Sequence, residues 1–418
     1  MAYNKKNRMK IILVVIDGLG DEAIPGLGKR TPLEAAKTPN LDFLANNGVC
    51  GQVKPFLFSW QKYPTSDTCH LALFGYPPKK YYLGRGVYET AGIGMEMKEG
   101  DVAFRVNFGT VNQKLKVVDR RAGRIENTEP LIKALAGLEL EGVRFLIKKS
   151  GGHRAGLILR SKNRKIFSSK ISDGDPKEIG LRVKKITPLD NSREARFTAN
   201  VLNRFLGKAH QILKNQPLNK KRIKNGLLPA NYLLIRGPGK MRKTPPFSKR
   251  YHLKPAFIAA GGLYKGIARI LGMTEIKVKG ANGLVSTNLK GKFWKAKKAV
   301  KQYNLIFLHI KAVDNLAEDG DFAAKKKFIE KIDKNLKEFK NIKGVLIVIT
   351  GDHSTCSLLR KHCNFPNPLL IYGAKNEIEQ AGFSEKACQR GKLGKFPQIE
   401  LMPKILNYAR RLDSRNSK

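Results

Sequence analysis

Two apolar segments joined by one amphipathic segment restrict the fold of this chain more than any other feature. The first covers residues 304–314 as NLIFLHIKAVD, and the second covers residues 344–352 as GVLIVITGD. Between them, DFAAKKKFIEKIDKNLKEFK repeats its apolar side chains at helical spacing. Strands joined through a helix of this length run parallel and close together, because the crossover returns to the same end of the sheet. The pattern therefore predicts an α/β fold with a mostly parallel sheet.

Three apolar runs each deliver an aspartate at or just past their end. KIILVVID ends at Asp17, and the two segments above end at Asp314 and Asp352. Open α/β sheets place ligands at the carboxyl ends of their strands, so the three carboxylates would meet if all three strands share one sheet. Taken singly, each aspartate is better explained as a turn former or a helix N-cap. Together with His353 and His362 they predict a metal site, where two divalent cations would offset the repulsion between carboxylates.

Residues 63–76, YPTSDTCHLALFGY, predict a loop that enters a helix near Ser66. Ser66, Asp67 and Thr68 are residue types that cap helices, which is one interpretation. The other places the Ser66 hydroxyl at the helix N-terminus facing the metal site. There a cation and the helix dipole would favour an alkoxide or an attached phosphoryl group. The segment alone favours the cap, whereas its combination with the three aspartates favours a nucleophile.

The chain length, the cysteines and the apolar runs limit the class of protein. A chain of 418 residues is long enough for two domains, each with its own core. Its 5 cysteines form no C-x-x-C pair and leave an odd count, which predicts reduced thiols in the cytosol rather than a disulfide framework. The runs IILVVI and GVLIVI are too short to span a bilayer, and MAYNKKNRMK shows no signal-peptide pattern. We therefore expect a soluble, cytoplasmic protein without membrane contact.

The chain is strongly basic, with 80 Lys and Arg against 34 acidic residues and a formal net charge of +46. Such an excess promotes contact with polyanions. The basic residues are spread along the chain, with clusters such as NKKRIKN at 219–225, and no aromatic RNA-binding motif accompanies them. We expect non-specific polyanion contact and no dedicated nucleic-acid binding.

Seven separate segments together carry a resemblance to a known family. They are DGLGDEAIPGLGKRTPLEAAKTPNLDFLA (17–45), SDTCHLALFGY (66–76), YYLGRGVYETAGIGM (81–95), VDRRAGRI (118–125), GLYKGIARILGM (262–273), HIKAVD (309–314) and GDHST (351–355). In this order they resemble the cofactor-independent phosphoglycerate mutases of the archaeal type, within the alkaline phosphatase superfamily. The sister group of proposed homoserine kinases shares the opening segment but lacks the T-x-H that Thr68 and His70 provide here. The resemblance extends over most of the chain.

The resemblance implies an isomerase of glycolysis and gluconeogenesis that interconverts 3-phosphoglycerate and 2-phosphoglycerate without 2,3-bisphosphoglycerate. The phosphoryl group would pass through a phosphoserine at Ser66, at a site with two divalent cations. Manganese or magnesium is expected, with cobalt or zinc as alternatives. Two other functions stay open: a metal-dependent phosphomonoesterase or related phosphotransferase of the same superfamily, and a catalytically weakened, basic nucleic-acid-binding member.

The resemblance also implies which residues hold the cations. One cation would be held by Asp17, Ser66, Asp352 and His353, and the other by Asp314, the residue at position 318 and His362. The family carries histidine at that position, whereas this chain reads DNLAEDGD and has Glu318. A glutamate supplies oxygen ligands, which suit Mg²⁺ or Mn²⁺ better than softer metals. Asp319 or Asp321 could serve in its place.

The fold implied by the resemblance is alkaline phosphatase-like and discontinuous. Residues 1–100 and 248–418 would form a doubly wound α/β domain, and residues 101–247 an inserted, smaller α+β domain that binds substrate. In the sequence, a helix-like run covers 193–213, and RGPGKMRKTPPFSKR at 236–250 predicts an exit linker. Planar guanidinium groups suit phosphate and carboxylate, and an ammonium near a glycine-rich helix start suits an oxyanion. The substrate-binding candidates are His70, Arg85, Arg121, Arg124, Arg236 and Lys265, of which His70 is equally compatible with a purely structural helix position.

Overall fold

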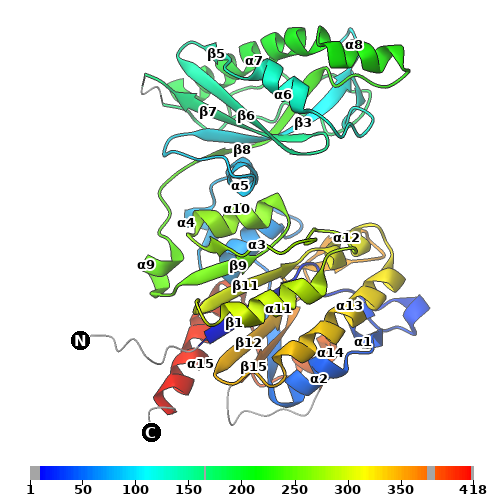
Figure 1. Ribbon diagram of the computed structural model, residues 1–418, viewed down its shortest axis with the longest axis vertical. Coiled ribbons are helices and arrows are strands. Elements are labelled where there is room, and N and C mark those ends of the chain that lie inside the picture. The colour runs from blue at the N-terminus through cyan, green and yellow to red at the C-terminus, as the bar shows by residue number, and fades with distance from the viewer. Residues whose placement is uncertain (1–9, 164–165, 374–381, 416–418) are drawn as a thin grey trace. The chain divides into compact units, whose positions relative to one another are not determined.

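The computed structural model describes residues 10–163, 166–373 and 382–415. Its backbone divides into two compact units, whose elements are labelled in Figure 1. Unit 1 comprises residues 1–82 and 245–418, and unit 2 comprises residues 83–244. The sequence placed these boundaries at 100/101 and 247/248, so residues 83–100 fall in unit 2 here.

Unit 1 is built on an eight-stranded, mostly parallel sheet. Its strands, in sheet order, are β10 (Thr274–Glu275), β9 (Pro255–Ile258), β11 (Leu305–Ile310), β1 (Lys10–Ile16), β12 (Val345–Thr350), β15 (Asn367–Tyr372), β2 (Gly48–Lys54) and β16 (Lys395–Pro397). Strand β15 alone runs antiparallel to both of its neighbours. Strand β1 lies between β11 and β12 and is parallel to both, with Val14 opposite Leu308 and Ile349. The predicted parallel crossover from residue 305 to residue 350 is confirmed.

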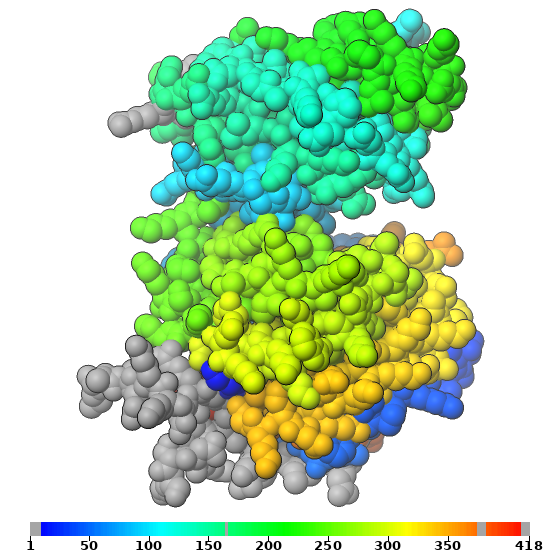
Figure 2. All heavy atoms as spheres, viewed as in Figure 1, coloured from blue at the N-terminus to red at the C-terminus, as the bar shows by residue number. Residues whose placement is uncertain are grey.

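Helices cover both faces of the unit 1 sheet, as a doubly wound fold requires. Apolar side chains of α11 (Leu289–Ala299) and α13 (Phe322–Leu336) pack with Ile306 and Leu308 on one face. On the other face, Phe307 of β11 meets His70 and Phe74 near helix α3 (Ser66–Leu73). In the space-filling view, the yellow-green and yellow atoms that include α11 and α13 form one continuous surface (Figure 2).

The remaining elements of unit 1 are short helices and one hairpin outside the main sheet. They are η1 (Pro25–Leu27), α1 (Pro32–Ala35), α2 (Pro39–Asn46), α4 (Pro78–Tyr81), α9 (Phe247–Tyr251), α10 (Gly262–Ile270), α12 (Ala312–Glu318), η2 (Lys337–Phe339), β13 (Ser354–Cys356), β14 (Lys361–Cys363), α14 (Glu385–Gln389), η3 (Gln398–Glu400) and α15 (Leu401–Arg415). Cys356 and Cys363 are joined by a disulfide across the β13–β14 hairpin. The expectation of reduced cysteines is therefore wrong for this pair. The two cysteines are seven residues apart, a spacing that predicts no disulfide by itself, and it is the hairpin that brings them together.

Unit 2 is an antiparallel sheet backed by helices. Its strands are β4 (Val117–Asp119), β3 (Val102–Val111), β7 (Arg154–Ser161), β6 (Val143–Gly151) and β5 (Glu139–Leu140) in sheet order, with β8 (Tyr232–Lys240) on β3. Its helices are α5 (Arg85–Gly92), α6 (Glu129–Leu135), α7 (Arg193–Lys214) and α8 (Pro217–Lys224). Helix α7 confirms the predicted helix at 193–213, and its Phe205 ring stacks on Phe145 with centroids 4.0 Å apart.

The predicted exit linker is wrong for residues 236–240, which continue strand β8 along β3. Pro238 lacks an amide hydrogen, but the register shift between Ala103 and Arg105 places it within a bulge of β8, where it has no partner in the regular ladder. Gly86 explains why residues before 100 belong to unit 2: a Cβ there would lie 2.2 Å from the Ala103 carbonyl oxygen of β3. The described residues hold no helix long and apolar enough to cross a membrane.

Candidate metal centre and nucleophile

The three aspartates lie at neighbouring strand ends in unit 1. Asp17 follows β1, Asp352 follows β12, and Asp314 lies in the first turn of α12 just beyond β11. All three carboxylates are buried. Gly18 joins the segments: its amide donates to Asp352 at 3.2 Å, and a Cβ on it would lie 2.8 Å from the Asp314 Cα. Glycine is required there both by this close approach and by its φ of 67°.

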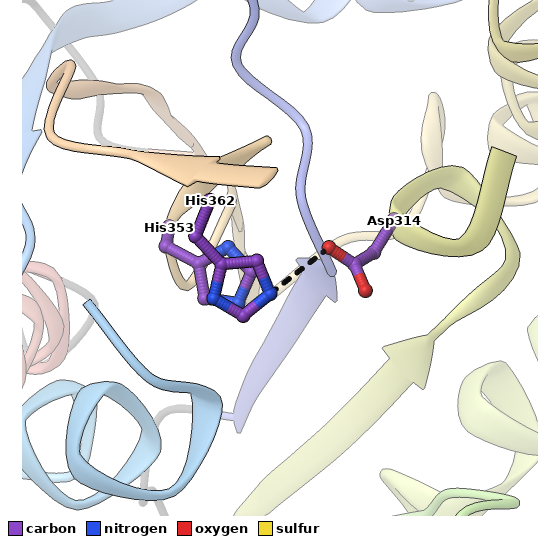
Figure 3. A group of neighbouring side chains, drawn as sticks. All are labelled: Asp314, His353 and His362. Atoms are coloured by element: carbon purple, nitrogen blue, oxygen red, sulfur yellow. Dashed lines mark ion pairs between the residues drawn. The ribbon is translucent and has the colours of Figure 1, made fainter. Parts of the chain in front are cut away.

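Two overlapping sets of side chains could each hold a metal ion. The Asp17 group comprises Asp17, Asp352 and His353, and the Asp314 group comprises Asp314, His353 and His362. Figure 3 shows the Asp314 group, with the two imidazole rings stacked at a centroid distance of 3.8 Å. One ligand atom of His362, Nε2, lies 3.6 Å from Asp314 Oδ1. His353 belongs to both groups, so the two candidate cation sites are adjacent.

Several buried oxygens of the Asp17 group lack a hydrogen-bond partner among the described residues: Asp17 Oδ1 and Oδ2, and Asp352 Oδ2. Lys311 and His309 approach Asp17 Oδ2 at 3.3 and 3.2 Å, and Lys311 also pairs with Asp314. Buried carboxylate oxygens without donors are costly unless a cation neutralises them. The donor set of carboxylates and imidazoles therefore fits a divalent ion.

The protonation states of this cluster follow from burial and from its charges. Burial opposes ionisation of Asp17, but Lys311 and His309 hold its pKa well below the usual value. Burial lowers the pKa of His353 to about 4, which leaves the imidazole neutral and able to act as a ligand. Burial and the charge of Asp17 raise the pKa of Asp352 to about 7.

His362 behaves differently from His353. Although burial lowers its pKa, a hydrogen bond to Glu318 and the charge of Asp314 raise the pKa to about 9. A cation bound here would have to displace a proton from this ring, since ligation requires the free nitrogen lone pair. Its other nitrogen, Nδ1, lies 2.8 Å from the Pro64 carbonyl oxygen, which fixes the ring orientation.

Ser66 points its hydroxyl into the cluster. Ser66 is the first residue of α3, and Thr65, not Ser66, occupies the N-cap position. The cap interpretation of Ser66 is therefore wrong, because a side chain one residue inside the helix is directed away from the cap amides. Its Oγ instead lies 3.0 Å from His353 Nε2, and the residue is only 5% exposed.

Glu318 ends helix α12 next to His362. Its Oε1 lies 3.6 Å from His362 Nε2, and the side chain is half-exposed. Asp321 is committed elsewhere, because its carboxylate accepts the Ala324 amide at the start of α13. Of the acids offered by the sequence as substitutes for the family histidine, Glu318 is the one with an ion-pair contact to His362.

The substrate candidates of unit 1 are engaged in other contacts. His70 is buried, with Nδ1 2.7 Å from the Ser66 carbonyl oxygen and 3.4 Å from Asp352 Oδ2. Burial lowers its pKa to about 4. Lys265, in α10, pairs with Glu275 at 2.8 Å. These contacts hold His70 and Lys265 in structural roles, and neither side chain offers a free positive charge to a substrate at the cluster.

The arginine candidates all lie in unit 2. Arg85, at the start of α5, pairs with Glu89, and Arg236 of β8 lies 3.8 Å from Asp175. Arg121 and Arg124 are exposed in the turn after β4.

Sequence reasoning missed Arg105 of β3, which is close enough to Arg85 and Arg236 for their charges to act on it. Burial lowers its pKa to about 10, with repulsion from Arg85, Arg236 and Arg154. Burial and the charges of Arg154 and Arg121 likewise lower the pKa of His153 to about 4. A lone arginine inside the apolar strand VAFRVNFGTV was the signal that could have found Arg105, since a charge there needs a partner.

Sequence reasoning also missed three unit 1 residues that touch the cluster. They are His309 and Lys311, both inside the HIKAVD segment, and Thr355, whose Oγ1 donates to Asp314 at 2.6 Å. The signal was the alternation of β11: side chains two residues apart share one face, so His309 follows Phe307 toward the site.

Known proteins match nearly the whole chain. A family model described as 2,3-bisphosphoglycerate-independent phosphoglycerate mutase matches residues 45–219. The protein of that name from Methanococcus aeolicus is 42% identical over 403 residues, covering 96% of this chain and 98% of the relative. A second, from Methanocaldococcus jannaschii, is 41% identical over 415 residues and covers 98% of each chain.

Two solved structures share the fold. One, of a Pyrococcus horikoshii protein, has a TM-score of 0.83 at 30% identity and covers 97% of this chain and 98% of that one. The other is the cofactor-independent phosphoglycerate mutase of Thermoplasma acidophilum, with a TM-score of 0.72 at 34% identity, covering 96% of this chain and 100% of that one. The predicted α/β fold class is confirmed. The chain belongs to the family of 2,3-bisphosphoglycerate-independent phosphoglycerate mutases.

Proposed function

We propose that this protein interconverts 3-phosphoglycerate and 2-phosphoglycerate, a step of glycolysis and gluconeogenesis, by way of a phosphoryl group carried on Ser66. The observation that supports this most strongly is the buried Ser66 hydroxyl, 3.0 Å from His353 Nε2 and thus at the edge of both candidate cation groups. Family membership supplies the substrate class.

Two divalent cations complete the proposed site, with manganese or magnesium preferred. Asp17, Ser66, Asp352 and His353 would hold one, and Asp314, Glu318 and His362 the other. When bound, the cations would supply positive charge that neutralises the carboxylates and the transferring phosphoryl group and lowers the pKa of the Ser66 hydroxyl. The unpartnered oxygens of Asp17 and Asp352 support this assignment.

Ser66 would act as the nucleophile in both directions. Its Oγ forms a bond to phosphorus while the bond from phosphorus to the glycerate oxygen breaks, and the proton lost by the Ser66 hydroxyl passes to the glycerate oxygen. The glycerate then turns, its other hydroxyl attacks the phosphoserine and gives up its proton, and the Ser66 oxygen leaves phosphorus and takes up a proton. Amide N–H groups in the first turn of α3 favour the added negative charge. Positioning and charge neutralisation dominate such a reaction, because phosphoryl transfer needs little covalent chemistry from the protein.

Unit 2 would recognise the charged ends of the substrate. Arg85, Arg121, Arg124 and Arg236 are proposed to bind carboxylate or phosphate, and we add Arg105 to them. Arg105, Arg85 and Arg236 are partly exposed and repel one another, and such guanidinium groups are stabilised when an anion binds between them.

The direct test is an assay of purified protein with 3-phosphoglycerate in a series of Mg²⁺, Mn²⁺, Co²⁺ and Zn²⁺. Phosphorus NMR separates isomerisation from hydrolysis. We expect 2-phosphoglycerate as the product, at least about 10-fold more with Mn²⁺ or Mg²⁺ than after chelation. Release of inorganic phosphate without isomer formation would assign a phosphomonoesterase instead.

We predict that Glu318→His changes metal preference more than turnover. A glutamate adds a negative charge and oxygen ligands, whereas histidine offers a neutral nitrogen, so the variant should shift its preference from Mg²⁺ toward softer ions such as Co²⁺. Metal content by elemental analysis and turnover with each ion check this. Glu338→His, at a surface glutamate paired with Lys297, is the control and should behave as the parent. An inactive parent with one bound metal, rescued in both respects by Glu318→His, would contradict retained activity.

A further inference from the structure

The β13–β14 hairpin carries both imidazoles of the Asp314 group and is closed by a disulfide. His353 immediately precedes β13, and His362 is the central residue of β14, opposite Thr355. Side chains alternate along a strand, so Thr355 and His362 face one side while Cys356 and Cys363 face the other. The disulfide therefore lies on the back of the hairpin, behind the residues that meet the cation groups.

Strand β13 is fixed to the protein by buried hydrogen bonds. The Thr355 amide donates to the Gly20 carbonyl at 3.0 Å, and its hydroxyl donates to Asp314. At the end of the strand, both the amide and the hydroxyl of Ser357 donate to Asp21, at 3.0 and 2.5 Å. These contacts do not involve β14 or the disulfide, so β13 and His353 would keep their positions without it.

Strand β14 is held less firmly. Lys361 is exposed and His362 only partly buried, and the preceding turn exposes Leu358 and Leu359. Besides the ladder to β13, β14 is linked to the protein through the His362 ring, whose Nδ1 lies 2.8 Å from the Pro64 carbonyl and whose Nε2 lies 3.6 Å from both Asp314 Oδ1 and Glu318 Oε1. The disulfide is the covalent tie between Cys363, next to His362, and the fixed strand.

We propose that the Cys356–Cys363 pair is a reversible thiol–disulfide site that sets the cation affinity of the Asp314 group and leaves that of the Asp17 group nearly unchanged. The inference rests on the proposed two-cation function. A dithiol would supply two electrons and two protons: its thiolate attacks one sulfur, a mixed disulfide forms, and the second thiol displaces it, leaving two cysteine thiols and an oxidised dithiol. Cys363 is 5% exposed and Cys356 is fully buried, so the attack would begin at Cys363.

Reduction would weaken cation binding by loosening the position of His362, and it would not change the charge of the Asp314 group. His362 would still be present, but its backbone would lose the restraint that holds the ring over His353 and against Pro64. Loss of contacts that orient a metal-binding histidine costs about 10- to 100-fold in metal affinity. His353 precedes the fixed strand, so the Asp17 group should change by less than about threefold.

The test measures Mn²⁺ binding to the full-length protein by calorimetry, before and after treatment with dithiothreitol, with free thiols counted in each sample. We expect two more thiols after reduction and a 10- to 100-fold weaker second Mn²⁺ site. Cys356→Ser/Cys363→Ser should bind like the reduced parent and ignore dithiothreitol, whereas Cys388→Ser, at a buried cysteine outside the hairpin, should respond as the parent does. In His362→Ala, the remaining site should not respond to dithiothreitol.

Three results would overturn the proposal: an unchanged thiol count, unchanged Mn²⁺ affinity after reduction, or equal weakening of both sites. Because metal binding is measured without turnover, failure of the mutase proposal is distinguishable. A protein that shows the redox-dependent Mn²⁺ site but no isomerisation keeps this inference and loses the proposed function. A protein that isomerises phosphoglycerate but binds Mn²⁺ equally well before and after reduction keeps the proposed function and loses this inference.

Discussion

Replacing Ser66 by alanine is expected to lower the turnover of 3-phosphoglycerate by about 10⁴-fold or more, because no other group in the proposed mechanism can carry the phosphoryl group. The substitution removes one buried hydroxyl, whose contact is with His353 Nε2. The fold should survive, since Thr65 and not Ser66 is the N-cap of α3. Phosphorus NMR of product formation, alongside thermal unfolding, measures both effects.

The control for this variant is Ser248→Ala. Ser248 lies in the same unit, is exposed, and belongs to the short helix α9, so its loss should leave turnover at the parent value. A second check follows from the mechanism: parent protein quenched in acid during turnover should carry phosphate on Ser66, and the variant should carry none. Isomerisation by Ser66→Ala within tenfold of the parent rate would exclude a phosphoserine at this position.

Replacing Lys325 by methionine is expected to lower the free energy of unfolding by about 3–5 kcal/mol, because it leaves a buried carboxylate without its partner. Lys325 is fully buried in α13. Its Nζ donates to Asp21 Oδ2 at 2.8 Å and to the carbonyls of Thr355 and Gly20 at 3.0 and 3.2 Å. These bonds join the segment after β1 to the segment after β12, so the variant should also lose cation affinity.

Lys326→Met is the matched control. Lys326 is the next residue of the same helix, partly exposed, and its nearest acid, Glu330, is 3.8 Å away, so the change should stay within about 0.5 kcal/mol. Urea unfolding at a fixed metal concentration measures both variants. Asp21→Asn/Lys325→Met should recover part of the lost stability, since no unpaired charge is then buried. A loss below about 1 kcal/mol for Lys325→Met would show that the ion pair does not hold the two segments.

Local patterns predicted the carboxyl ends of the strands because a short apolar segment is enough to identify a buried strand and the end at which it leaves the sheet. The apolar runs before Asp17, Asp314 and Asp352 are each buried along nearly their whole length, and a short run of this kind predicts an inner strand of a sheet. The placement of β1 between β11 and β12 depends on strands that pair across 294 and 335 residues, and periodicity carries no such information. The same holds for antiparallel β15, which interrupts the parallel order.

The site was less predictable where the position of a residue depends on a partner elsewhere in the sequence. The Cys356–Cys363 disulfide requires a hairpin that the segment after GDHST does not announce, because its strands are three residues each. Arg236 was read as part of a linker end, but β8 continues past it through a bulge. Lys325 shares the apolar face of its helix with Phe328 and Ile329, so periodicity places it toward the core, but its acidic partner Asp21 lies 304 residues away in the sequence.

The central position of β1 has a consequence for synthesis on the ribosome. Residues 10–16 emerge before the other described strands of the sheet, and the two strands that flank them begin only at residues 305 and 345. Unit 2 is continuous from residue 83 to residue 244, so its contacts are complete while unit 1 still lacks most of its sheet. Domains generally fold as soon as they can bury their own core. The inserted unit should therefore be native first, while the earliest-made strand waits, unpaired, for the last third of the chain.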